Sequence, residues 1–228
     1  MANSKVKALL FMKANSERIP GKNMRLLCGR PLFHWILESL NESGVIDEII
    51  INTDSEEIAN SAKSCFNVTI HMRPDYLLDI QANEANQIMA YDLEQTDGDY
   101  FFQTHCTNPL LKSKTIKDAL NKYFKKLEKF DSLFSVTTLQ KRLYDEKFHA
   151  LNHDPQNLIK TQNLPFIFEE NSCFYIFSRK SFCENNNRIG AKPSLFPIDK
   201  FEAVDIDEEF DFLVAEKLME NRLTKTSF

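Results

Sequence analysis

The chain has 228 residues, of which 43% are hydrophobic and 27% charged, and its formal net charge is −5 at pH 7. This length and composition fit one or at most two globular domains with enough apolar side chains to form a core. The mild acidity argues against a general nucleic-acid coat, because binding along a phosphate backbone needs a basic surface. No apolar run approaches the roughly 20 residues that a membrane-spanning helix requires.

The cysteines indicate a reducing compartment. There are five, an odd number, and none forms a C-x-x-C pair. Such scattered residues are typical of free thiols rather than of a disulfide framework. The first apolar run, of about five residues, is too short for a signal peptide. We therefore expect a cytoplasmic protein that binds neither a membrane nor nucleic acid.

Short apolar runs alternate with amphipathic segments along the first 137 residues. The runs predict strands at residues 7–12, 48–53, 67–72, 99–104 and 132–137. The segments between them predict helices at residues 31–40, from 56 onward, at 83–94 and at 114–130. This alternation predicts an α/β fold, in which a mostly parallel, Rossmann-like sheet carries helices on both faces.

The alternation breaks at residues 139–168, which are polar and contain Pro155 and Pro165. The segment is long for a plain loop, so we expect an inserted lobe or an oligomerisation arm. Strands are predicted again at residues 172–177 and 202–207, followed by a helix at 209–222. The expected organisation is a single domain, residues 1–228, in which 139–168 is a small dimerisation insertion.

The loop after the first strand is a candidate anion site. Ligands of such sheets bind beyond the carboxyl ends of the strands. Cations and backbone N–H groups at a strand end can bind phosphate. The loop lacks the glycines of a Walker or dinucleotide motif, and a solvated basic turn would have the same composition. Its basic and neutral polar side chains are Lys13, Asn15, Ser16, Arg18, Lys22 and Asn23.

Asp205 and Asp207 are a candidate metal site. They stand two residues apart before the last predicted helix. On a strand, this spacing would put both carboxylates on one face, where they could hold a hard dication. The alternative is an acidic helix start that the helix dipole stabilises.

The chain resembles a known family at several separated motifs. Arg18-Ile-Pro-Gly-Lys-Asn23, followed by Gly29-Arg-Pro-Leu-Phe33, resembles the opening of the CMP-sugar synthetases. These are the acylneuraminate cytidylyltransferases and, more distantly, the 3-deoxy-octulosonate cytidylyltransferases. The resemblance continues in family order at residues 52–54, 73–74, 107–110 and 205–207, so it covers nearly the whole chain.

The resemblance implies a nucleotidyltransferase that joins CTP to the anomeric hydroxyl of an acidic keto-sugar, an N-acylneuraminate or related nonulosonate. The products would be pyrophosphate and a CMP-sugar for a surface glycan. It also implies Mg²⁺ or Mn²⁺ as cofactor and a homodimer. Two alternatives stay open: another acidic acceptor, such as a 3-deoxy-octulosonate or a phosphonate, or a catalytically silent nucleotide-binding protein.

The same resemblance implies roles for individual residues. Lys22, Asp205 and Asp207 would be catalytic, and the two aspartates would bind the metal. Gln103 and His105 are alternatives for one family glutamine, and His105 is favoured because it adjoins the Thr107-Asn-Pro-Leu110 motif. Nucleotide-binding roles are implied for Lys13, Asn15, Ser16, Arg18, Lys22, Asn23, Arg73, Asn83 and Thr107. Acceptor-binding roles are implied for Gln103, His105, Lys160, Thr161, Gln162, Glu170 and Asn171.

The chain also departs from the family pattern. Lys13 replaces a loop arginine and so loses its planar fork. Thr161 and Glu169 stand where sialate-type relatives use arginines for the sugar carboxylate, and Lys160 is the only cation close by in the sequence. Either another group holds the carboxylate, for example Lys160 of a partner subunit, or the acceptor is not an ordinary sialic acid. We therefore expect residues 139–168 to pair subunits and to help form the acceptor pocket.

Overall fold

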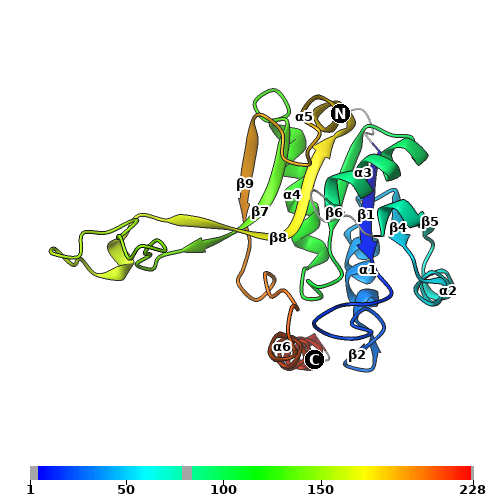
Figure 1. Ribbon diagram of the computed structural model, residues 1–228, viewed down its shortest axis with the longest axis horizontal. Coiled ribbons are helices and arrows are strands. Elements are labelled where there is room, and N and C mark those ends of the chain that lie inside the picture. The colour runs from blue at the N-terminus through cyan, green and yellow to red at the C-terminus, as the bar shows by residue number, and fades with distance from the viewer. Residues whose placement is uncertain (1–4, 79–83, 227–228) are drawn as a thin grey trace.

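A computed structural model describes residues 5–78 and 84–226 of the chain (Figure 1). Its centre is a seven-stranded sheet in the order β5-β4-β1-β6-β8-β7-β9. The pairs β5–β4, β4–β1, β1–β6 and β7–β9 are parallel, whereas β8 runs antiparallel to β6 and β7. The prediction of a mostly parallel α/β sheet is confirmed.

The strands of this sheet are β1 (Val6–Met12), β4 (Glu48–Thr53), β5 (Thr69–Met72), β6 (Tyr100–Thr104), β7 (Ser132–Leu139), β8 (Ile167–Ser178) and β9 (Pro193–Pro197). A two-stranded ribbon is formed by β2 (Leu26–Leu27) and β3 (Arg30–Pro31). The helices are α1 (Leu32–Ser43), α2 (Glu56–Cys65), α3 (Glu84–Gln95), α4 (Ser113–Lys125), α5 (Arg179–Asn185) and α6 (Glu209–Thr226). Two 3₁₀ turns are η1 (Asp75–Leu77) and η2 (Thr161–Asn163).

Helices cover both faces of the sheet. One apolar cluster joins the sheet to α1, α2 and α4, with Phe33, Ile58 and Ile116 among its members. A second cluster, on the other face, joins the sheet to α3 and α5 through Met89 and Phe182. A third packs α6 against the loop after β1 and against α1. The last contact matters for function, because it brings the C-terminal helix to the first loop.

One of the two predicted caps of α2 acts as a cap in the structure. Ser55 caps α2, since its hydroxyl accepts a hydrogen bond from the Ile58 N–H over 3.2 Å. Asp54, the other predicted cap, instead accepts a bond from the backbone N–H of Ala14 over 2.6 Å. Asp54 therefore ties the first loop to the end of β4.

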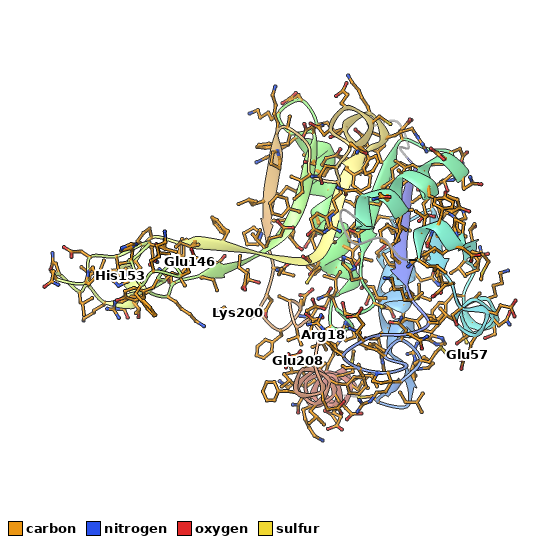
Figure 2. All side chains as sticks on the ribbon, in the orientation of Figure 1. Arg18, Glu57, Glu146, His153, Lys200 and Glu208 are labelled. Atoms are coloured by element: carbon orange, nitrogen blue, oxygen red, sulfur yellow. The ribbon has the colours of Figure 1, made fainter. Side chains whose placement is uncertain are left out.

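An arm extends from the sheet (Figure 1). Strands β7 and β8 form an antiparallel ribbon, and residues 140–166 continue it away from the helices. This arm contains η2 and one isolated bridge between Tyr144 and Ala150. Figure 2 labels Glu146 and His153 within it. Most of its large apolar side chains are exposed, Phe148 most of all at 86%, whereas Leu164 is buried. The break predicted at residues 139–168 thus falls on this arm.

Two sequence predictions were wrong in detail, and two elements were missed. The helix expected at residues 114–130 ends at Lys125. Residues 202–207 form no strand; loop hydrogen bonds hold them instead, such as the bond from Ile206 N–H to the Thr107 carbonyl over 2.9 Å. The sequence also did not reveal β9, an edge strand with proline at both ends, or the ribbon β2–β3. That ribbon turns at Cys28 and Gly29, both with positive φ, as a type I′ turn requires.

Within the described ranges, no helix is both long and apolar enough to cross a membrane. All five cysteines are free thiols, as their spacing predicted.

Candidate active site

The polar loops that follow β1, β4, β5 and β6 meet at one edge of the sheet, where these parallel strands end. The segment before α6 joins them. Figure 2 shows Arg18, from the loop after β1, beside the start of α6, where Glu208 is labelled. Residues more than 180 positions apart in the sequence are therefore neighbours at this edge.

The loop after β1 is held in one conformation by its own hydrogen bonds. Pro20 and Gly21 form a tight turn, closed by a 3.1 Å bond from the Lys22 N–H to the Ile19 carbonyl. Gly21 has a φ of 65°, as the third residue of a type II turn requires. The Asn23 amide donates to the Lys13 carbonyl over 2.8 Å. The cations of the loop thus project from a fixed backbone.

Two of these cations contact the segment before α6. Lys22 is 9% exposed, and its Nζ donates to the Ile206 carbonyl over 2.6 Å. Arg18 pairs with Asp207, with 2.6 Å between Nη2 and Oδ1. Because Ile206 lies between the two aspartates, the first loop and the candidate metal site form one cluster.

Asp205 is the more buried of the two aspartates. Burial raises the pKa of its carboxyl, and the negative charge of Asp207 adds to the rise, while a hydrogen bond from the Thr107 hydroxyl opposes it. The Oδ1 of Asp205 is buried and has no hydrogen-bond partner in the structure. An orphaned carboxylate oxygen beside a second carboxylate fits a cation, although no strand aligns the pair.

The described residues contain no group of three or more His, Cys, Asp or Glu side chains arranged to hold a metal ion. Two carboxylates nevertheless fit Mg²⁺, which commonly takes one or two carboxylates and completes its shell with water and substrate phosphates.

A cavity of about 310 Å³ opens beside this cluster. Its lining comes from β1, α3 and the loops after β1, β5 and β6: Phe11, Lys13, Arg73, Ala85, Ile88 and His105. Arg73 is 5% exposed, and its Nε donates to the Asn52 Oδ1 over 2.7 Å. Asn52 in turn donates to Asp92 over 2.8 Å. A fixed arginine and a lysine therefore give this cavity a positive wall.

Gln103 and His105, the two alternatives for one role, are placed differently. Gln103 is fully buried, and its amide nitrogen donates to the Thr104 carbonyl and lies 3.1 Å from the His105 Nε2. His105 lines the cavity. Burial, with the positive charges of Arg188 and Lys22, lowers the pKa of His105 to about 4. A neutral His105 can accept the Gln103 N–H and still face a ligand.

The other predicted acceptor residues divide into two groups. Asn171 and Glu170 lie on β8: Asn171 accepts from the Ser135 hydroxyl over 2.6 Å, and Glu170 accepts from the Tyr175 hydroxyl. Lys160, Thr161 and Gln162 are exposed on the arm and do not line the cavity of their own chain.

The remaining residues that were predicted to bind the nucleotide differ in their exposure. Asn15 is exposed, Ser16 and Thr107 are half-buried, and Asn23 is buried. Asn83 lies outside the described residues.

Two neighbours of the cluster were missed in the sequence. The buried thiol of Cys106 donates to the Asn23 Oδ1 over 2.9 Å, and burial raises its pKa to about 12. Arg188 donates to the Gln103 Oε1 over 2.9 Å. Arg188 stands in a polar stretch without periodicity, so no sequence signal marked it; only the fold brings it to β6.

Comparison with known proteins finds a matching family and several similar chains. The family described as cytidylyltransferase matches residues 8–225. The N-acylneuraminate cytidylyltransferase A of Danio rerio is 27% identical over 93% of this chain, and the chain spans about half of that relative's length. The CMP-N,N'-diacetyllegionaminic acid synthase of Legionella pneumophila is 28% identical, over 95% of this chain and 97% of its own.

Among solved structures, a CMP:2-keto-3-deoxy-manno-octonic acid synthetase complexed with CTP has a similar fold. It aligns with a TM-score of 0.71 at 12% identity and covers 96% of this chain and all of its own. At this identity the likeness concerns the fold alone.

Proposed function

Because the chain belongs to the cytidylyltransferase family, we propose that it transfers CMP from CTP to an acidic keto-sugar, an N-acylneuraminate or related nonulosonate. The observation that carries this proposal is the joining of the first loop to the Asp205–Asp207 segment through Lys22 and Arg18. Cations for a triphosphate and carboxylates for a metal then stand at one edge of the sheet.

The proposed reaction forms one bond and breaks one. The anomeric oxygen of the sugar attacks the α-phosphorus of CTP, and the bond from this phosphorus to pyrophosphate breaks. Catalysis of such transfers consists mainly of positioning and charge stabilisation. Lys13 and Arg73 on the cavity wall, with Lys22 and Arg18 beside it, supply positive charge for the phosphates.

We propose that Asp205 and Asp207 hold Mg²⁺ or Mn²⁺. The orphaned Oδ1 of Asp205 supports this assignment. The bound ion would supply positive charge at the reacting phosphate. Arg18, whose side chain is 57% exposed, neutralises Asp207 in the structure. Its guanidinium can exchange this carboxylate for a phosphate, because both accept its paired N–H groups.

We also propose that the arm pairs two copies of the chain. Its exposed large apolar side chains support this, since such a surface is unusual on a monomer. They are Tyr144, Phe148, Leu151, Leu158, Ile159 and Phe166. In such a dimer Lys160 would enter the acceptor site of the partner subunit.

We also propose a cytoplasmic location, which the free thiols and the use of CTP support.

One assay separates these functions. The full chain is incubated with CTP, Mg²⁺ and a panel of acceptors that contains nonulosonates, an octulosonate and a phosphonate, and pyrophosphate release is measured. We expect release with nonulosonates, no release with ATP in place of CTP, and loss of release in EDTA. Release only with the octulosonate or phosphonate would assign another acceptor. CTP binding without release from any acceptor would indicate a silent nucleotide-binding protein.

A further inference from the structure

We propose that Arg188, from the loop after α5, binds the carboxylate of the acceptor and so determines specificity for acidic sugars. This inference rests on the proposed function and assigns the group that holds the acceptor's charge. The arm carries Thr161 and β8 carries Glu169, where an arginine of this role was expected from the resemblance.

The guanidinium of Arg188 is held in a fixed plane. It lies over the ring of Tyr175, with 3.7 Å from Cζ to the ring centroid. Its Nη1 donates to the Gln103 Oε1 over 2.9 Å. Stacking and a hydrogen bond together orient the planar fork, while the residue stays half-buried and so remains accessible to a ligand.

Arg188 forms no ion pair with a carboxylate among the described residues. Tyr175 and Glu170 act on it electrostatically and the Tyr175 side chain also hydrogen-bonds to it, but the Glu170 carboxylate accepts its own hydrogen bond from the Tyr175 hydroxyl. Burial lowers the pKa of Arg188, so removal from water is the largest influence on this group. A half-buried guanidinium with unused donors is best satisfied by a carboxylate bound through two parallel N–H groups.

The position of Arg188 fits the acceptor side of the reaction. From Arg188, a chain of contacts passes through Gln103 to His105, which lines the cavity. Lys13 and Arg73 line the same cavity, where the phosphates are proposed to bind. Arg188 does not itself line this cavity, so the proposal places the sugar carboxylate at the exposed side of Arg188, away from the phosphates.

The backbone near Arg188 is also fixed. The Gly190 N–H donates to the Ser132 hydroxyl over 2.9 Å. A Cβ at Gly190 would meet the Asp131 Oδ1 at 2.3 Å and the Ser181 Oγ at 2.5 Å, so only glycine fits. This close approach holds the loop against β7 and α5, and Arg188 with it.

The test compares Arg188→Ala and Arg188→Lys with the wild-type chain, using a nonulosonate acceptor and its C1 methyl ester. The wild type should use the acid at least 30-fold more efficiently than the ester. Arg188→Ala should raise the KM for the acid about 30-fold, lose its preference over the ester, and keep the KM for CTP within twofold. Arg188→Lys should fall between, since it keeps the charge without the fork.

Arg179→Lys is the matched control. Arg179 also lies over an aromatic ring, that of Phe101, but it donates to three backbone carbonyls and so acts on stability. This variant should melt at a lower temperature and keep the preference for the acid.

Each outcome decides between the two proposals. If the wild type is active and Arg188→Ala keeps the acid preference, the inference is wrong and the proposed function stands. If the wild type releases no pyrophosphate with any acceptor, the proposed function fails. Circular dichroism checks folding, and if Arg188→Ala is unfolded, Arg188→Gln and Arg188→Lys provide the same comparison. A merely structural role would lower stability without changing the ratio of acid to ester.

Discussion

The Nζ of Lys22 donates to the backbone carbonyl of Ile206 over 2.6 Å, across 184 residues of sequence. The bond joins the loop after β1 to the segment between the two candidate metal ligands. Lys22 is therefore a structural link as well as a candidate phosphate-binding cation.

Replacing this lysine should impair both roles. Lys22→Ala should raise the KM for CTP at least tenfold, because positive charge is lost beside the phosphates. It should also lower the free energy of unfolding by about 1–3 kcal/mol, since the buried Ile206 carbonyl loses its donor. Steady-state kinetics and urea unfolding measure the two effects. Lys117→Ala, at an exposed position of α4, is the control, and equal behaviour of the two variants would contradict both roles.

Asp207→Asn should reduce turnover by at least a hundredfold and leave the fold intact. The substitution keeps the side-chain volume but removes one charge from the proposed metal site. Titration with Mg²⁺ at fixed CTP should show weaker metal dependence in the variant. Glu208→Gln changes the neighbouring, exposed carboxylate and should retain full activity. Turnover of Asp207→Asn within tenfold of wild type would show that the metal assignment is wrong.

His105 should make stability depend on pH. Its pKa in the folded chain is about 4, below the ordinary value of 6.5, so the unfolded chain binds a proton first as the pH falls. The free energy of unfolding should therefore fall as the pH is lowered from 6.5 to 4, by up to about 1.4 kcal/mol per pH unit. Above pH 6.5 His105 is neutral in both the folded and the unfolded chain, so it causes no such loss there.

His105→Gln isolates this effect. The free energy of unfolding is measured by urea at pH 7 and 4.5 for both proteins. On going from pH 7 to pH 4.5, the wild type should lose more stability than His105→Gln, because glutamine does not bind a proton. An NMR titration of the ring with a midpoint near 6.5 would refute it.

Disrupting the apolar surface of the arm should separate the proposed dimer. Phe148 and Phe166 are 86% and 60% exposed in the single chain, so Phe148→Ser and Phe166→Ser should not harm its folding. Light scattering at micromolar concentration should detect a dimer for the wild type and a monomer for the double variant, with activity lost in parallel. Phe210→Ser, at an exposed position of α6, is the control. A wild type that is monomeric and fully active would contradict a shared site.

The central strands could be predicted from the sequence because they are buried on both faces. Strand β1 was expected at residues 7–12 and spans Val6–Met12, and nearly all its residues are buried. Residues 202–207 also alternate in polarity, yet their backbone groups bond to loops. Asn108, for example, donates to the Val204 carbonyl. Periodicity cannot separate these cases, since the partner lies 96 residues away.

Some residues of the candidate site could be predicted from the sequence and others could not. The first loop and the aspartate pair carry compact motifs, so their residues could be named from the sequence. Arg188 carries none, and its partners Tyr175 and Gln103 come from two strands that only the fold brings together. Residues defined by tertiary contacts alone leave no local pattern.

Strand β8 has a consequence for how two subunits would work together. This strand of 12 residues carries Phe168 next to the arm and Tyr175 beneath Arg188, and the two are separated by an irregularity in its pairing with β7 where Ser172 has a φ of 56°. One strand thus joins the proposed subunit contact to the proposed acceptor wall. If Lys160 completes the partner's site, each site takes Asp207 from one subunit and Lys160 from the other. Asp207→Asn and Lys160→Ala then remove contributions from different subunits. Mixing these two inactive variants would then form heterodimers with one intact site, and activity would return.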